Sequence, residues 1–151
     1  MGESLQKINN ILIADDHKLV AKLIYSYLVN FVNMNLVGSA SSGEEVIEIA
    51  RASRVDLVLM DIVMPGMNGL VTAKALYEID PNIKIIFLSG LNNKNIIHEA
   101  IKIGADGFLT KNASIEEIIE GIQTVLRGDK YFSKECMNVY VKEQEAETAV
   151  Y

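Results

Sequence analysis

The residues of this sequence with the clearest capacity for chemistry are carboxylates that follow apolar runs. Asp15 and Asp16 follow the run Ile11–Ala14, and Asp61 follows the run Val55–Met60. Apolar runs of this length, followed by turn residues, are typical of buried strands. Burying a carboxylate costs free energy unless a partner offsets its charge. Three acids at such positions therefore indicate a metal ion and a reaction at one of them.

Mutual repulsion among the three carboxylates favours a hard divalent cation. Two unit charges about 4 Å apart repel by about 4 kcal/mol at an effective dielectric constant of about 20. Mg²⁺ suits the site because it accepts one or two carboxylates, keeps several waters and also binds phosphate oxygens. The backbone carbonyl of Val63, in the turn after Asp61, is the expected further ligand. We expect Asp61 to be the best exposed acid and the nucleophile, since carboxylates can form aspartyl phosphates.

Two further polar residues come after strand-like runs. Ser89 follows Ile83–Leu88, and Lys111 comes just after Gly107–Leu109. The Lys111 ammonium could pair with one phosphoryl oxygen, and the Ser89 hydroxyl could hydrogen-bond another. Both residues therefore fit a site at which Asp61 receives a phosphoryl group.

The two histidines and the cysteine are not expected to take part in the reaction. His17, beside the acid pair, could be a metal ligand, but we favour a solvated histidine at a helix start. His98 is expected on the surface of a helix. Cys136 is the single cysteine, so no internal disulfide can form, and we expect an inert thiol in a reducing, cytoplasmic setting.

Strand-like and helical patterns alternate along the chain and must position these residues. The five expected strands are Asn10–Ala14, Leu36–Ala40, Val55–Met60, Ile83–Leu88 and Gly107–Leu109. Five helices are expected between and after them, with boundary signals at Ser42 and Glu45, Asn68, Gly104, Ser114 and Glu117, and Gly128. This alternation predicts one α/β domain with a parallel sheet covered on both faces. Ligands of such sheets bind beyond the carboxyl ends of the strands, where the polar residues are expected to meet.

The ordered set of motifs resembles the receiver domain of two-component response regulators. Its members are Asp15-Asp16, Asp61 followed by Met64–Gly69, then Leu88–Gly90, and finally Gly104–Lys111. The spacings are 45 residues from Asp16 to Asp61, 28 from Asp61 to Ser89 and 22 from Ser89 to Lys111. The resemblance covers roughly residues 8–127, which leaves 1–7 as an N-terminal extension and 128–151 as a linker helix and tail.

The resemblance implies a flavodoxin-like, doubly wound sheet of five parallel strands in the order 2-1-3-4-5, with five helices and a C-terminal linker helix. It implies that Asp61 accepts a phosphoryl group from a histidine of a sensor kinase, and that Asp15 and Asp16 hold Mg²⁺ with it. Ser89 would move toward the phosphoryl group and Phe108 would follow inward as an aromatic switch. Lys111 would be the cation of the site. The chain would act as a phosphorelay acceptor that catalyses its own phosphorylation and slow dephosphorylation.

The sequence departs from the family pattern at two places. Asn112 stands after Lys111, where many receivers carry a proline with a cis peptide bond. A cis bond before any other residue costs about 2.5–4 kcal/mol, so either isomer remains open here. Val63 and Leu91 are apolar at positions that, in the family, flank the path of the hydrolytic water. We therefore expect slow loss of the phosphoryl group.

The segment Gly128–Ser133 resembles the piece after the receiver in regulators that carry a helix-turn-helix DNA-binding domain. No such domain follows in this sequence, so the chain is either truncated or a stand-alone receiver. DNA contact is expected only through a further domain, since the net charge of −6 disfavours binding to phosphates. Ser133 is expected to cap a last helix that runs through about Glu147. The narrow apolar side of that helix consists of Met137, Tyr140 and Val141.

Other functions were weighed against a phosphorylation switch with a sensor kinase and a second copy of the chain as partners. A pseudo-receiver that acts as an interaction scaffold has the same fold, but the intact acidic set argues against it. A flavin protein needs a phosphate-cradling loop after the first strand, where this chain has Asp15–Lys18. An aspartyl phosphatase would carry a second acid at Val63. No signal peptide or membrane-spanning run is visible, so no membrane partner is expected.

Overall fold

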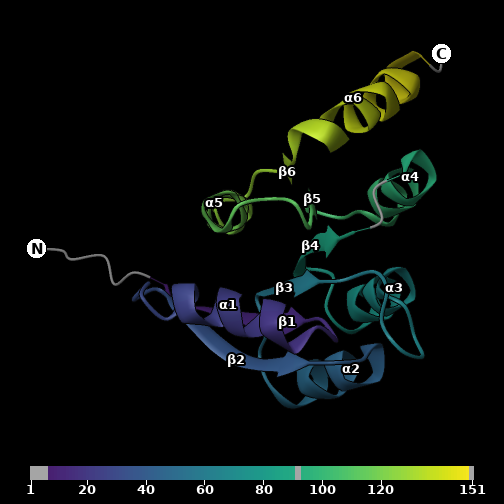
Figure 1. Cartoon of the computed structure of the whole chain (residues 1–151). Helices are drawn as coiled ribbons and strands as arrows, with labels where there is room; N and C mark the ends of the chain where they lie inside the picture. The colour runs from purple at the N-terminus through teal and green to yellow at the C-terminus, as the bar shows by residue number, and fades with distance from the viewer. Residues whose placement is uncertain (1–6, 91–92, 150–151) are drawn as a thin grey trace, which may run out of the picture.

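One parallel sheet with helices on both faces forms the fold (Figure 1). The computed structural model describes residues 7–90 and 93–149. The strands are β1 (Asn9–Ala14), β2 (Met34–Ala40), β3 (Leu57–Met60), β4 (Lys84–Ser89), β5 (Gly107–Thr110) and β6 (Tyr131–Phe132). The helices are α1 (Lys18–Leu28), α2 (Gly43–Ala52), α3 (Gly69–Ile79), α4 (Lys94–Ile103), α5 (Ile115–Leu126) and α6 (Lys134–Ala149). Within the described ranges, no helix is long and apolar enough to cross a bilayer.

The strand order is β2-β1-β3-β4-β5-β6, which confirms the flavodoxin-like order 2-1-3-4-5 and adds a strand. The prediction of five strands was one short, because a two-residue strand is too brief to show a periodic pattern. Gly107 lies opposite Tyr131, and Phe108 lies opposite Phe132. A Cβ atom on Gly107 would lie 2.5 Å from the Tyr131 carbonyl oxygen. Glycine at this position therefore allows β6 to approach β5.

Two apolar cores, one on each side of the sheet, hold the layers together. Successive strand residues point to opposite faces, so each central strand contributes to both cores. The side covered by α2, α3 and α4 contains Leu12, Ala14, Val58, Met60, Ile85, Phe87 and Phe108. The side covered by α1 and α5 contains Ile11, Ile13, Leu57, Leu59, Ile86, Leu88 and Leu109. Figure 1 shows these two groups of helices on opposite sides of the strands.

The predicted helix starts are confirmed at three positions. Ser42, Asn68 and Ser114 each accept the backbone N–H of the residue three positions later, at 3.2, 2.9 and 3.1 Å. Such caps satisfy amide groups that have no partner within the helix. The Glu117 carboxylate accepts the hydroxyl of Tyr131 at 3.1 Å, which ties α5 to β6.

The last helix, α6, packs against α4 and β6, and of its predicted apolar side Tyr140 is confirmed whereas Met137 and Val141 turn outward. Cys136 is fully buried, and the Tyr140 ring stacks on Phe132 with 4.4 Å between centroids. Met137 and Val141 are 41% and 43% exposed. Positions four apart share a helix face, so burial of residue 136 selects 140 and turns 137 and 141 outward. As a result, α6 covers the edge of the sheet beside α4.

Candidate functional site

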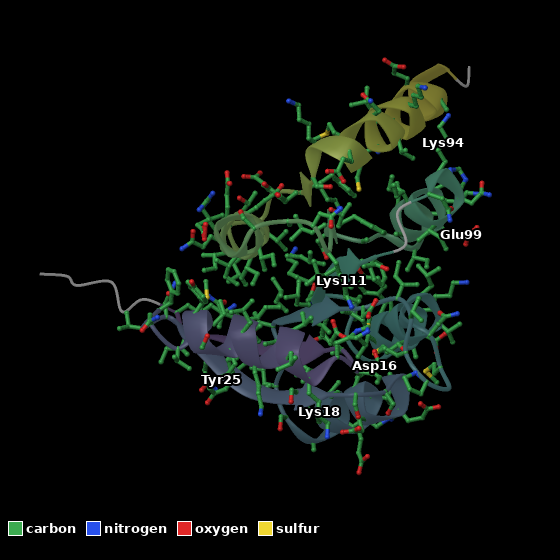
Figure 2. All side chains as sticks on the ribbon, in the orientation of Figure 1. Asp16, Lys18, Tyr25, Lys94, Glu99 and Lys111 are labelled. Atoms are coloured by element: carbon green, nitrogen blue, oxygen red, sulfur yellow. The ribbon has the colours of Figure 1, made fainter. Side chains whose placement is uncertain are left out.

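The carboxyl ends of β1 and β3 bring the three predicted acids together. The backbone N–H of Asp61 donates to the Ala14 carbonyl at 2.8 Å, which sets the two strand ends side by side. Asp15, Asp16, His17 and Asp61 each offer one ligand atom, and these atoms lie within 4.8 Å of one another. Figure 2 labels Asp16 in this region together with Lys111. The site therefore contains the predicted acids and also His17, which stands at the start of α1 with its side chain 61% exposed, as interpreted from the sequence.

Exposure within the cluster differs from the expectation. The side chains of Asp15 and Asp61 are 4% and 3% exposed, whereas that of Asp16 is 36% exposed. The prediction that Asp61 is the best exposed acid was therefore wrong. Asp61 directly follows the central strand β3, and Ile62 and Met64 after it are buried. A strand flanked on both sides leaves its terminal side chain little access to solvent.

Lys111 is the cation of the cluster. Its Nζ atom donates to Asp61 Oδ2 at 2.7 Å and lies 3.0 Å from Asp15 Oδ2. Nζ also lies 3.0 Å from His17 Nδ1. Burial lowers the pKa of Lys111, but hydrogen bonds and charge attraction from Asp61 and Asp15 outweigh it and raise the pKa above its usual value. The side chain is thus held as a protonated ammonium against two buried carboxylates.

The turn after β3 is held against the start of α3. The Val63 backbone N–H donates to Asp61 Oδ1 at 3.2 Å, and the Gly69 N–H donates to the Ile62 carbonyl at 2.7 Å. A Cβ atom on Gly69 would lie 2.3 Å from the Asp61 carbonyl oxygen. Glycine is therefore needed where α3 meets the residue that carries the carboxylate. The proposed role of the Val63 carbonyl as a metal ligand stays a prediction.

The remaining predicted residues lie on β4 and β5 beside the cluster. Ser89 is the last residue of β4 and is fully buried, and its carbonyl accepts the Lys111 N–H at 3.0 Å. Phe108 is fully buried in the core, with its ring centroid 6.1 Å from that of Phe87. The peptide bond between Lys111 and Asn112 is trans, which agrees with the cost of the cis form before a residue other than proline.

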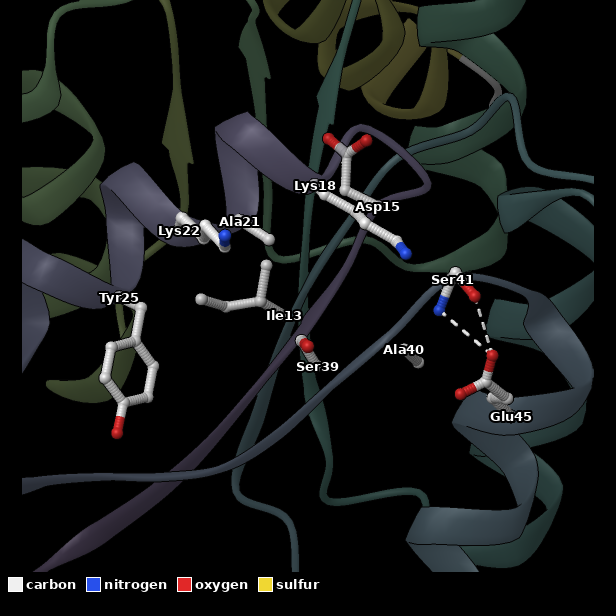
Figure 3. A pocket seen from close by; sticks show the side chains of 10 residues that line it. All are labelled: Ile13, Asp15, Lys18, Ala21, Lys22, Tyr25, Ser39, Ala40, Ser41 and Glu45. Atoms are coloured by element: carbon white, nitrogen blue, oxygen red, sulfur yellow. Dashed lines mark hydrogen bonds between the residues drawn. The ribbon is translucent and has the colours of Figure 1, made fainter.

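A cavity of about 290 Å³ adjoins the acid cluster between α1 and β2. Asp15 is the member of the cluster that lines it, together with Lys18, Lys22 and Tyr25 of α1. Figure 3 shows the Asp15 carboxylate pointing away from Ser39 and Tyr25 at the other end of this cavity. The cavity is therefore a neighbour of the carboxylate cluster and not its opening.

The donor set fits Mg²⁺. Three carboxylates converge, and the partly exposed Asp16 lets water reach the cluster, as an ion that keeps several waters requires. The hard oxygen ligands match the ion's preference, and Lys111 supplies a second positive charge for an incoming anion. When bound, Mg²⁺ would neutralise charge on a phosphoryl group beside Asp61.

Comparisons with known proteins agree with this arrangement. The family model described as the response regulator receiver domain matches residues 11–123. The response regulator GacA of Pseudomonas aeruginosa is 34% identical over 123 residues, which are 82% of this chain and 58% of the relative. The chain thus spans little more than half the length of that relative.

Solved structures share the fold. The isolated REC domain of RcsB from Salmonella enterica serovar Typhimurium, determined with the phosphomimetic BeF₃⁻, superposes with a TM-score of 0.82 at 22% identity, covering 88% of this chain and 99% of that one. A structure of two RcsB dimers bound to two parallel DNAs has a TM-score of 0.81 at 22% identity, covering 88% of this chain and 68% of that one. These structures show the shared fold, and the family model that matches residues 11–123 shows that the chain belongs to the response regulator receiver domain family.

Proposed function

We propose that Asp61 accepts a phosphoryl group from a phosphohistidine of a sensor kinase, and that this modification switches the chain's choice of partner. The observation that carries the proposal is the contact of Asp61 with Lys111 at 2.7 Å, inside a cluster with two further acids. A lone buried carboxylate paired with a lysine would be a structural ion pair. The added pair Asp15 and Asp16 gives the site the excess negative charge that a divalent cation neutralises.

In the proposed reaction, one Asp61 carboxylate oxygen attacks phosphorus. The oxygen–phosphorus bond forms as the bond between phosphorus and the imidazole nitrogen breaks, and the leaving imidazole keeps the bonding electron pair. Lys111 already lies beside Asp61 Oδ2, so it would move only from one oxygen to another as the phosphoryl group arrives. Positioned cations of this kind stabilise the negative charge that develops in phosphoryl transfer.

Strand order, and not exposure, favours Asp61 over the other two acids. β3 lies between β1, which is followed directly by Asp15 and Asp16, and β4, which ends at Ser89. A phosphoryl group on Asp61 would therefore have Asp15, Asp16 and their bound cation on one side and the Ser89 hydroxyl on the other. Asp15 lies on the far side of this arrangement, and its Oδ1 already accepts the His17 N–H at 2.7 Å.

The switch would act through the loops after β3 and β4 and through β5. Phosphorylation adds charge and acceptor oxygens, which would draw Ser89 and Lys111 and bias the population of the attached segments. A movement of Phe108 would displace the start of α6, because the Phe108 carbonyl accepts the N–H of Ser133 at 2.9 Å just before that helix. We place the partner face around α4, β5 and α5, and since α6 covers the edge beside α4, this face would include α6.

The proposed partners are a sensor histidine kinase and, after phosphorylation, a second copy of the chain. The RcsB structure described as dimers on DNA supports association of this kind. Control of transcription would act through a DNA-binding domain of the kind found in such regulators. Slow loss of the phosphoryl group remains a prediction from Val63, which is 53% exposed, and from Leu91, which lies outside the described residues.

Mass measurement after incubation with acetyl phosphate and Mg²⁺ tests the proposal. We expect wild type to gain one phosphoryl group and Asp61→Asn to gain none, while Asp16→Asn labels slowly because it keeps the nucleophile but weakens the metal site. Labelling of Asp61→Asn would assign the nucleophile elsewhere. An unlabelled wild type with no response to beryllofluoride would favour an interaction scaffold instead.

A further inference from the structure

We propose that the cavity between α1 and β2 binds a small organic anion with a flat apolar body, of the class of aryl carboxylates. The proposal goes beyond the proposed function, because phosphoryl transfer at Asp61 makes no use of this cavity. Asp15 borders both the cavity and the acid cluster. A ligand bound there would therefore lie beside the phosphoacceptor site without blocking it, and would give the domain a second input.

Small side chains leave space between the helix and the strand. Ile24 and Leu28 of α1 are buried against the sheet, and Ala21 lies on the same face of the helix, three residues before Ile24. Ser39 and Ala40 of β2 line the other side of the cavity. Protein interiors are ordinarily packed to high density, so three small residues around one point leave a hollow, here of about 290 Å³.

The lining combines a buried apolar part with an aromatic ring at one end. Ile13 and Ala40 are 1% and 2% exposed, whereas Tyr25 is 52% exposed and lies at the end away from the Asp15 carboxylate (Figure 3). Mostly apolar linings with a few polar groups are usual for small-molecule sites, which commonly measure about 300–1,000 Å³. This cavity is at the small end of that range. It therefore suits a ligand built on a single ring, which can stack on Tyr25.

Two lysines that line the cavity supply positive charge. Lys18 and Lys22 are four residues apart on α1, so their side chains leave the helix on the same side. Among the residues that the structure describes, neither ammonium makes a hydrogen bond or an ion pair, and the hydroxyls of Tyr25 and Ser39 make no hydrogen bond. Ammonium and hydroxyl groups are hydrogen-bond donors. The cavity thus offers a ligand four donor groups, two of them charged.

The two acids that line the cavity are engaged by other groups. Asp15 Oδ2 lies 3.0 Å from Lys111 Nζ, and Asp15 Oδ1 accepts the His17 N–H at 2.7 Å. Glu45 Oε1 accepts the Ser41 hydroxyl at 2.7 Å, as the dashed line in Figure 3 shows. The charge at the cavity without a partner is therefore that of the lysines. Positive charge beside an apolar lining selects an anion that carries an organic body over a bare inorganic ion.

Titration of the intact ¹⁵N-labelled chain with benzoate, followed by amide chemical shifts, tests the proposal. Benzyl alcohol is the matched probe, because it keeps the ring but has no charge. We expect saturable shifts at Ala21 and Ser39, with benzoate binding about fivefold more tightly than benzyl alcohol, as one exposed ion pair permits. Lys22→Gln should remove that difference and leave the affinity for benzyl alcohol unchanged. Lys74→Gln, on α3 and outside this cavity, is the control and should behave as wild type.

Ala21→Leu fills the cavity and should abolish the binding of both probes. The absence of saturable shifts at the cavity in wild type would overturn the proposal, and so would equal affinities for benzoate and benzyl alcohol. Unchanged benzoate binding by Ala21→Leu would place the ligand elsewhere and overturn it as well. The proposed function fails by a separate result, the labelling of Asp61→Asn by acetyl phosphate, which does not depend on this cavity.

Discussion

Replacement of Gly69 by alanine tests how closely α3 must approach the Asp61 backbone. The new Cβ would lie 2.3 Å from the Asp61 carbonyl oxygen and 2.8 Å from the Ile62 Cα, whereas real Cβ contacts under 3.0 Å are essentially never seen. Either the helix or the loop must move by about 0.7 Å. Overpacking of this kind costs about 3 kcal/mol, and the better helix propensity of alanine returns about 1, so we expect a net loss of about 2 kcal/mol.

Urea unfolding followed by circular dichroism measures this loss. With a slope of about 2 kcal/mol per molar, the midpoint should fall by about 1 M. The site should suffer as well, because misplacing a reacting group by about 1 Å can lower a rate about a hundredfold. Acetyl phosphate labelling of Gly69→Ala is therefore expected to be at least about tenfold slower than that of wild type.

Gly90→Ala is the matched control, because it lies at the same end of the sheet and a Cβ there would have no atom of the described residues within 4 Å. Its unfolding free energy should stay within about 0.5 kcal/mol of wild type. If Gly69→Ala unfolds at the same urea concentration as Gly90→Ala and is labelled as fast, then α3 does not constrain Asp61 and the reasoning fails.

Three further predictions follow from the contacts around β6, α6 and Lys111. Burial and neighbouring carboxylates raise the pKa of Tyr131 from 10.0 to about 12, so stability present below pH 10 should be lost as pH rises toward 12. Tyr131→Phe should flatten that decline in urea midpoints, and an unchanged slope would refute the assignment. Tyr140→Ala removes the ring stacked on Phe132 and should speed amide exchange in α6, which the exposed Met137→Ala should not do. Lys111→Met should raise Mg²⁺ affinity roughly fivefold by calorimetry, since it removes about 1 kcal/mol of charge competition, while slowing labelling of Asp61.

The positions of the site residues could be predicted because strand ends are visible in sequence. Apolar runs locate β1, β3, β4 and β5, and the residue after each run must lie at the carboxyl edge of a parallel sheet. Asp61 and Lys111 both lie at that edge for this reason, and their side chains meet there. The order of the strands came from the family resemblance, because alternating patterns do not say which strands are neighbours.

Exposure and side-chain direction could not be predicted in the same way. The burial of Asp61 depends on β3 being central and on the packing of the following turn, which are tertiary properties. The approach of His17 to the acids depends on the extended backbone at the start of α1, where a capping residue would have turned toward the helix. The face of α6 depends on β6, whose two residues carry too little pattern to be recognised.

Because β6 pairs with β5, a movement of β5 would tilt α6 as a rigid helix. The backbone N–H of Tyr131 donates to the Asp106 carbonyl, and that of Ser133, directly before the helix, donates to the Phe108 carbonyl, so the base of the helix is firmly held. A helix of 16 residues is about 24 Å long, and a tilt of about 5° at the base would carry its far end by about 2 Å. A small rearrangement of β5 beside the acid cluster would then move the far end of α6 by a larger distance. That displacement is large enough to break or form side-chain contacts.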